Sequence, residues 1–95
     1  MKEQAVQKKI IKYLESLGAW TCKTITTNKR GTPDVLACLD GRFIAIEVKA
    51  PGKMSTVSEL QQFQLDKIAA TGGIAIAADS LEKVKEILDK VQNKV

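Results

Sequence analysis

Residues 31–50 read GTPDVLACLDGRFIAIEVKA, and the pattern within them predicts the centre of a β-sheet. Two apolar runs, Asp34–Leu39 and Arg42–Ala50, are separated only by Asp40-Gly41. Asp-Gly between two such runs indicates a two-residue type I′ turn, in which both central residues take positive φ. The two runs are therefore expected to form an antiparallel hairpin.

In the second run successive side chains alternate between the two faces of the strand, so Glu47 and Lys49 point to the same side. Burying a charged group without a partner is costly, so the presence of two charged residues in such an apolar strand requires a structural or functional explanation. One interpretation is an ion pair at the strand end. The other is a carboxylate metal ligand beside an ammonium that orients water or stabilises phosphate charge.

Asp34 favours the second interpretation. With the turn at residues 40–41, it lies opposite about position 47, and two adjacent carboxylates repel each other unless a cation lies between them. An oxygen-only pair of this kind suits Mg²⁺, which keeps several waters and takes phosphate oxygens. Asp34 by itself is better explained as a turn cap after Pro33, but Asp34, Glu47 and Lys49 together favour a metal site.

Helical spacing of apolar residues appears before this hairpin, from Glu3 to Leu17, and Gly18 follows as a stop signal. A strand is expected over residues 19–25 and a loop over residues 26–31, where polar residues gather. The N-terminal part of the chain thus contributes a helix, an outer strand and a loop that leads into Asp34.

After Pro51-Gly52, a second helix is expected from about Thr56, which has capping-box spacing to Glu59, as far as Thr71. Residues 74–78 predict a short buried strand, and a last amphipathic helix begins where Asp79 and Glu82 repeat the capping-box spacing. The predicted order is α-β-β-β-α-β-α. It indicates an α/β fold with a mixed central sheet flanked by helices.

Two further polar residues are candidates for the site. Glu3 falls within the apolar stripe of the first helix and points to the core side, although a first-turn acid that complements the helix dipole explains it as well. Gln61 lies in the apolar stripe of the second helix, where a site carboxylate or Lys49 can provide its hydrogen-bond partner. A satisfied structural Gln is the alternative.

Composition narrows the class of protein. The 95 residues contain no His, two Cys and 44% hydrophobic residues, which suits one compact domain over residues 1–95. The absence of His removes the commonest general base and zinc ligand, and Cys22 and Cys38 are interpreted as small core residues. Phe43 and Phe63 are also expected in the core, so an aromatic stacking platform for single strands is not supported. No apolar run is long enough to span a membrane, and a cytoplasmic location is expected.

The net charge of +4 is compatible with a nucleic-acid partner without establishing one. Basic residues in or beside the segments expected around the site suit a phosphodiester backbone, although ordinary solvated charge explains any one of them. These DNA-binding candidates are Lys23, Lys29, Arg30, Arg42 and Lys53.

The ordered motifs resemble the PD-(D/E)XK nuclease superfamily, and more closely its virus-type replication-repair nuclease (VRR-Nuc) domain. That family shows an early helical Glu, a G-x-P-D turn, an E-V-K strand, a Gln early in the next helix and Gly-Gly before the last strand. The corresponding residues here are Glu3, Gly31–Asp34, Glu47–Lys49, Gln61 and Gly72-Gly73. The motifs span nearly the whole chain in the family's order.

The resemblance implies a restriction-endonuclease-like fold. It implies that Asp34 and Glu47 hold Mg²⁺ or Mn²⁺, with the Val48 carbonyl as a further ligand and Glu3 acting directly or through water. It also implies that Lys49 positions or activates the attacking water and that Gln61 supports the centre. Minimal stand-alone members of the family are often encoded by phages, resemble Holliday junction resolvases and act as homodimers. The resemblance therefore implies a role in DNA repair and a location in the cytosol of bacteria or of phage-infected cells.

The expected function is therefore metal-dependent, structure-specific cleavage of branched DNA, in the manner of a Holliday junction resolvase. Two alternatives stay open. One is a nuclease on other DNA structures, such as flaps, nicks or single strands. The other is a non-catalytic DNA-binding module, against which the acids of the Asp34-Glu47-Lys49 set argue, because binding alone does not need acids near phosphate.

Overall fold

The computed structural model describes residues 1–92 of the chain, so the last three residues of the expected domain, 93–95, lie outside the described residues. Its elements follow the predicted α-β-β-β-α-β-α order, with one 3₁₀ turn, η1, added before the second long helix. They are α1 (Glu3–Ser16), β1 (Trp20–Lys23), β2 (Val35–Leu39), β3 (Arg42–Val48), η1 (Met54–Thr56), α2 (Glu59–Ala70), β4 (Ile74–Ala78) and α3 (Leu81–Gln92).

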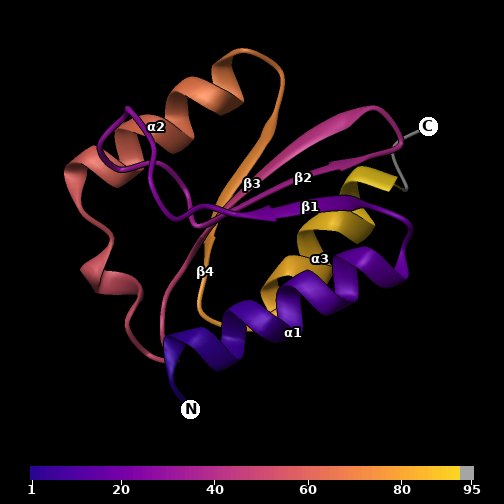
Figure 1. Cartoon of the computed structure of the whole chain (residues 1–95), viewed down its shortest axis with the longest axis horizontal. Helices are drawn as coiled ribbons and strands as arrows, with labels where there is room; N and C mark the ends of the chain where they lie inside the picture. The colour runs from indigo at the N-terminus through magenta and orange to yellow at the C-terminus, as the bar shows by residue number, and fades with distance from the viewer. Residues whose placement is uncertain (93–95) are drawn as a thin grey trace.

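The four strands form one mixed sheet in the order β1-β2-β3-β4. The first three strands are antiparallel, whereas β4 runs parallel to β3 because α2 carries the chain back across the sheet (Figure 1). The hairpin turn is as predicted: Leu39 pairs with Arg42, and Asp40 and Gly41 have φ values of 51° and 79°. This register places Asp34 opposite Glu47.

Helices cover both faces of the sheet: α1 and α3 lie on one face and α2 on the other (Figure 1). The central strand β3 is consequently buried from Ile44 to Val48 on both faces, which explains its nearly continuous apolar sequence. Val6, Ile10 and Leu14 of α1 pack against it as the helical spacing predicts. In the described residues no helix is both long and apolar enough to cross a bilayer.

The starts of two helices differ from the prediction. Thr56 does not cap α2, because its hydroxyl donates to Lys53 O within η1; Ser58 is the cap, in a capping box with Gln61. At α3, the Ser80 hydroxyl accepts the Lys83 N–H at 3.3 Å. In both places the sequence offers two adjacent candidate caps, and the path of the preceding loop selects one.

Asp79, the cap expected for α3, has another role. Its Oδ2 accepts the Gly52 N–H at 2.9 Å, and its Oδ1 lies 2.9 Å from Lys83 Nζ. These contacts lower the pKa of the Asp79 carboxyl, with the hydrogen bond to Lys83 as the largest cause. Asp79 thus links the segment after β3 to the start of α3.

The expectation that the aromatic and thiol side chains lie in the core is wrong for most of them. Phe43 is 44% and Phe63 is 54% exposed, Cys38 is exposed and Cys22 is half-buried. The reason is that α2 packs on β3 and β4 and leaves the β1–β2 side of its face uncovered. Alternation along a strand tells which side chains share a face, but not whether a helix covers it.

Candidate active site

Asp34 occupies the end of the loop that enters β2, where it reaches across to β3. Its Oδ2 accepts the Val48 N–H at 2.9 Å, and its carbonyl oxygen accepts the Thr24 N–H, also at 2.9 Å. Pro33, which is buried, precedes it and fixes the backbone that leads into the strand. The Asp34 carboxyl is therefore held between β1 and β3, beside Glu47 as the hairpin register predicted.

Glu47 is the buried acid of the site, with only 3% of its surface exposed. Its Oε2 accepts a hydrogen bond from Gln61 Nε2 at 3.1 Å and lies 3.8 Å from Lys49 Nζ. Its Oε1 is buried and has no hydrogen-bond partner among residues 1–92. A buried carboxylate oxygen without a partner is costly, which marks this oxygen as the place where a cation would be bound.

The pKa of Glu47 is raised to about 8; burial is the largest cause, and the adjacent Asp34 carboxyl and the negative charge of Glu3 contribute to the rise. The positive charge of Lys49 lowers the pKa of Glu47, but by less than the other contributions raise it. The protein alone therefore disfavours the ionised form of Glu47. A divalent cation beside the two carboxyls would stabilise that form.

Lys49 follows Glu47 by two residues and projects from the same face of β3. Its backbone N–H donates to Ala78 O at 2.9 Å, which extends the β3–β4 pairing beyond Val48. Its side chain is only 12% exposed. The ammonium is thus confined next to the carboxyls and lies where it can contact a substrate phosphate or the water that attacks it.

Gln61, rather than the adjacent Gln62, reaches the site. Its Oε1 accepts the Ser58 N–H at 2.9 Å while its Nε2 donates to Glu47, so one side chain caps α2 and contacts the buried acid. Gln62 instead donates to Asp66 on the exposed side of the helix. The position of the true helix start decides between the two glutamines, because it determines which residue is third in the helix.

Glu3 lies at the first residue of α1, and its negative charge acts on Glu47. However, no three acidic, Cys or His side chains among the described residues come close enough together to form a metal-binding group. The carboxylates that lie side by side are thus the pair Asp34 and Glu47. A pair suits Mg²⁺ or Mn²⁺, whose remaining positions are filled by water and substrate oxygens.

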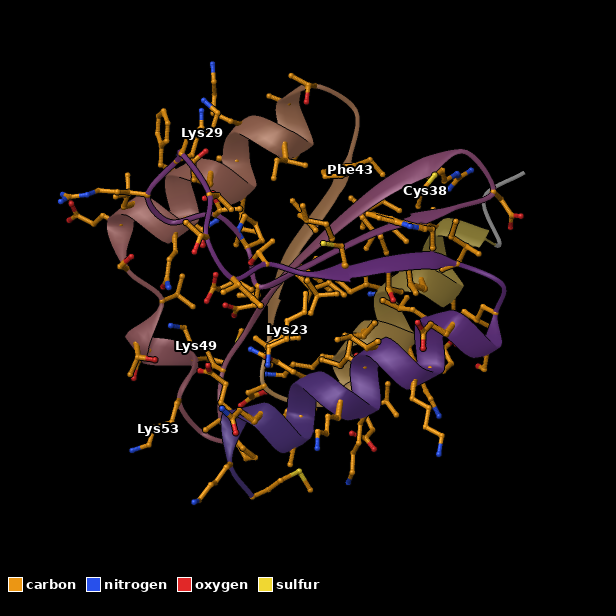
Figure 2. All side chains as sticks on the ribbon, viewed as in Figure 1. Lys23, Lys29, Cys38, Phe43, Lys49 and Lys53 are labelled. Carbon is orange, nitrogen blue, oxygen red and sulfur yellow. The ribbon has the colours of Figure 1, made fainter. Side chains whose placement is uncertain are left out.

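The five basic candidates do not all surround this site. Lys53 lies on the segment after β3 near Lys49, and Lys23 lies at the end of β1, paired with Val35 next to Asp34 (Figure 2). Lys29 and Arg30 belong to the loop that leads into Asp34, and Lys29 lies over α2 (Figure 2).

Arg42 was expected near the site but lies at the opposite end of β3. It is five residues before Glu47, which corresponds to about 17 Å along a strand, and its guanidinium donates to Val91 O of α3 at 3.4 Å. The sequence already indicated this distance. Arg42 directly follows the hairpin turn, whereas Asp34 and Glu47 lie at the open end of the hairpin.

The loop before Asp34 is held against the start of α2 by contacts that the sequence did not reveal. Gln64 Nε2 donates to Arg30 O at 3.1 Å, and the Thr27 and Thr32 hydroxyls are 2.7 Å apart within the loop. Gly31 has φ +79°, and a Cβ added there would lie 2.8 Å from Leu60 O. The close approach of the loop to α2 therefore requires Gly at this point, and it holds the loop that carries Asp34 against the helix that carries Gln61.

The sequence analysis did not single out two other features, a buried Gln and a row of exposed lysines at α1. Gln7 is 6% exposed although it was never considered as a site residue. The outer face of α1 also carries exposed lysines that the helical spacing could have indicated, namely Lys8, Lys9 and Lys12, and the exposed Lys2 directly precedes the helix.

Comparison with known proteins agrees with this geometry. The VRR-NUC domain model matches residues 1–82, which include every acidic and amide side chain of the site. The chain belongs to the VRR-NUC family. A protein named "Putative nuclease p44", from Acyrthosiphon pisum secondary endosymbiont phage 1, is 30% identical over 81 residues, which cover 84% of this chain and 85% of the phage protein.

A solved VRR-NUC domain has the same fold, with a TM-score of 0.79 over 100% of this chain and 99% of the other, at 22% identity. The VRR-NUC assignment, the mixed four-stranded sheet and the order of elements are therefore confirmed, and the chain is a nuclease by family.

Proposed function

We propose that this VRR-NUC protein is a metal-dependent, structure-specific endodeoxyribonuclease that hydrolyses phosphodiester bonds in branched DNA, in the manner of a Holliday junction resolvase. One observation carries the proposal: among the described residues Glu47 Oε1 is buried without a partner, beside the Asp34 carboxyl and next to the Lys49 ammonium. The ion pair with Lys49 does not account for this oxygen, because Lys49 and Gln61 both lie against the other oxygen, Oε2. A DNA-binding module would gain nothing from two acids near phosphate.

The residues fit Mg²⁺ or Mn²⁺. Asp34 and Glu47 would hold the cation, with the Val48 carbonyl as a further oxygen ligand and Glu3 acting through water. When bound, the cation lowers the pKa of water and neutralises charge on the phosphate. Cys22 and Cys38 lie outside this set, and oxygen ligands of this kind favour Mg²⁺ or Mn²⁺ over soft metals.

The chain's own residues supply the rest of the mechanism. Gln61 holds Glu47 Oε2 by a hydrogen bond, which would leave Oε1 available to hold the cation. Lys49, with its side chain largely screened from solvent, positions the attacking water and stabilises the negative charge that develops on the phosphate. Lys23, Lys29, Arg30 and Lys53 would neutralise neighbouring phosphates, and the lysines of α1 would extend this basic surface.

A homodimer is part of the proposal, because two cuts on symmetric strands need two active sites. Its support is an exposed aromatic surface formed by Trp20, Phe43 and Phe63, which are 64%, 44% and 54% exposed. Trp20 and Phe43 each pair with Cys38 and so share one sheet face, and Phe43 and Phe63 line one groove. Contiguous apolar surface of this kind marks a protein interface, and a second copy of the chain is the partner that the two cuts require.

The test uses a labelled four-way DNA junction and a matched linear duplex, each with Mn²⁺, Mg²⁺ or EDTA. We expect metal-dependent cutting of the junction, weak cutting of the duplex, and loss of cutting by a factor of at least about 100 in Lys49→Ala. Lys90→Ala, on the exposed side of α3 and outside the groove that Phe43 and Phe63 line, is the matched control and should retain activity.

Flap, nicked and single-stranded DNA are tested in the same series. If one of these is cut and the junction is not, the proposed substrate is wrong, whereas metal-dependent hydrolysis of DNA stands. The non-catalytic alternative is separated by a Mn²⁺ titration. No binding at millimolar Mn²⁺, or binding that is unchanged in Asp34→Ala, would contradict the catalytic proposal.

A further inference from the structure

Two buried side-chain oxygens in the described part of the chain have no hydrogen-bond partner: Glu47 Oε1 and Gln7 Oε1. The first belongs to the site above. Gln7 lies on α1 and is 6% exposed, between Val6 and Ile10 of the core. A buried amide oxygen without a partner is uncommon and costly, so it needs an explanation other than packing.

The position of Gln7 on α1 relates it to the active site. It follows Glu3 by four residues, so the two side chains lie on one face of the helix, about one turn apart. Side chains on a helix point back toward its N-terminus, and the Gln7 side chain is therefore directed toward Glu3. Helix α1 also packs on β3, the strand that carries Glu47, and Val6 next to Gln7 lies in one core cluster with Val48 next to Glu47.

We propose that Gln7 is a positioning residue of the active site, whose Oε1 accepts a hydrogen bond from a water molecule in the hydration shell of the cation held by Asp34 and Glu47. The proposal rests on the metal dependence proposed above. No protein donor meets Gln7 Oε1, and the described residues contain no third acid that completes a metal-binding group. A hydrated divalent cation presents water hydrogens, and these need acceptors such as the oxygens of Glu3 and Gln7.

The test compares Mn²⁺ affinity, by isothermal titration calorimetry, with thermal unfolding of the metal-free protein. Gln7→Met keeps the length of the side chain but removes the acceptor, and Gln7→Glu keeps an acceptor oxygen. We expect Gln7→Met to weaken Mn²⁺ binding about 10-fold to 100-fold, as other partners of metal-bound groups do. Its metal-free melting temperature should stay equal or rise, because an unsatisfied buried oxygen is lost.

Gln7→Glu should bind Mn²⁺ at least as tightly as the wild type, and Gln4→Met, on the exposed side of the same helix, should change neither property. Wild-type Mn²⁺ affinity in a folded Gln7→Met protein would overturn the proposal, as would an equal loss in Gln7→Glu. If Asp34→Ala abolishes binding while Gln7→Met keeps it, this inference fails and the proposed function stands. If the wild type binds no Mn²⁺, both fail.

Discussion

Among single residues, Glu47 combines deep burial, a neighbouring acid and an unpartnered oxygen. Burial, and after it the neighbouring Asp34, disfavour the ionised form and raise the pKa of Glu47 to about 8, from an ordinary value near 4.5. The unfolded chain has no such environment. Proton binding at Glu47 is therefore linked to folding, and this link gives a measurable dependence of stability on pH.

For the metal-free protein, the raised pKa predicts that the free energy of unfolding falls as pH rises from about 4.5 to about 8. Between these values the folded state keeps a proton on Glu47 that the unfolded state has lost. The stabilisation of the folded state by this proton is therefore complete below pH 4.5 and is lost as the pH rises through the folded pKa of about 8. Urea unfolding in EDTA from pH 5 to pH 9 measures it. Glu47→Gln should flatten the slope, and an identical slope in that variant would contradict the assignment.

Among the elements, the loop before β2 and the start of α2 act as one unit. Gly31 brings the loop backbone against Leu60 and Gln61, and Gln64 holds Arg30 from the next turn of the helix. These contacts determine where Gln61 lies relative to Glu47. A change at Gly31 is therefore expected to reach the site through α2.

Gly31→Ala should lower the free energy of unfolding by about 3 kcal/mol, because it adds both positive-φ strain and a clash with Leu60 O. Gly41→Ala is the matched control: Gly41 has the same φ of +79° but open space around it, so strain alone should cost about 1 kcal/mol. Urea denaturation gives both values. Equal losses in the two variants would show that the contact with α2 contributes nothing.

At the scale of the whole molecule, the uncovered part of the sheet face next to α2 carries the exposed aromatic surface. Phe63→Glu should leave the fold intact, since the side chain is 54% exposed, and should convert the proposed dimer to a monomer. Sedimentation equilibrium at tens of micromolar measures the mass. Paired cutting of a four-way junction should be lost with the dimer.

Ile25→Glu provides the control for this experiment, because Ile25 is 91% exposed and lies outside the groove that Phe43 and Phe63 line. It should leave the mass of the protein unchanged. A wild-type protein that is monomeric at these concentrations and still cuts junctions would refute the dimer.

The local pattern of the sequence was enough for the order of elements, the hairpin and the pairing of Asp34 with Glu47. These depend on residues close in the chain: Asp40-Gly41 specifies the turn, and the period of two specifies the face. Helix caps were less certain, since Thr56 and Ser58 are both good caps and only the η1 turn distinguishes them.

Tertiary structure alone decided which side chains are covered and which Gln reaches Glu47. Exposure of Phe43 and Phe63 depends on where α2 rests on the sheet, and the unpartnered oxygen of Gln7 depends on what α1 meets. The spacing of apolar residues along a helix or strand indicates on which face of that element a side chain lies. Burial and pKa depend instead on neighbours distant in sequence, which no local pattern specifies.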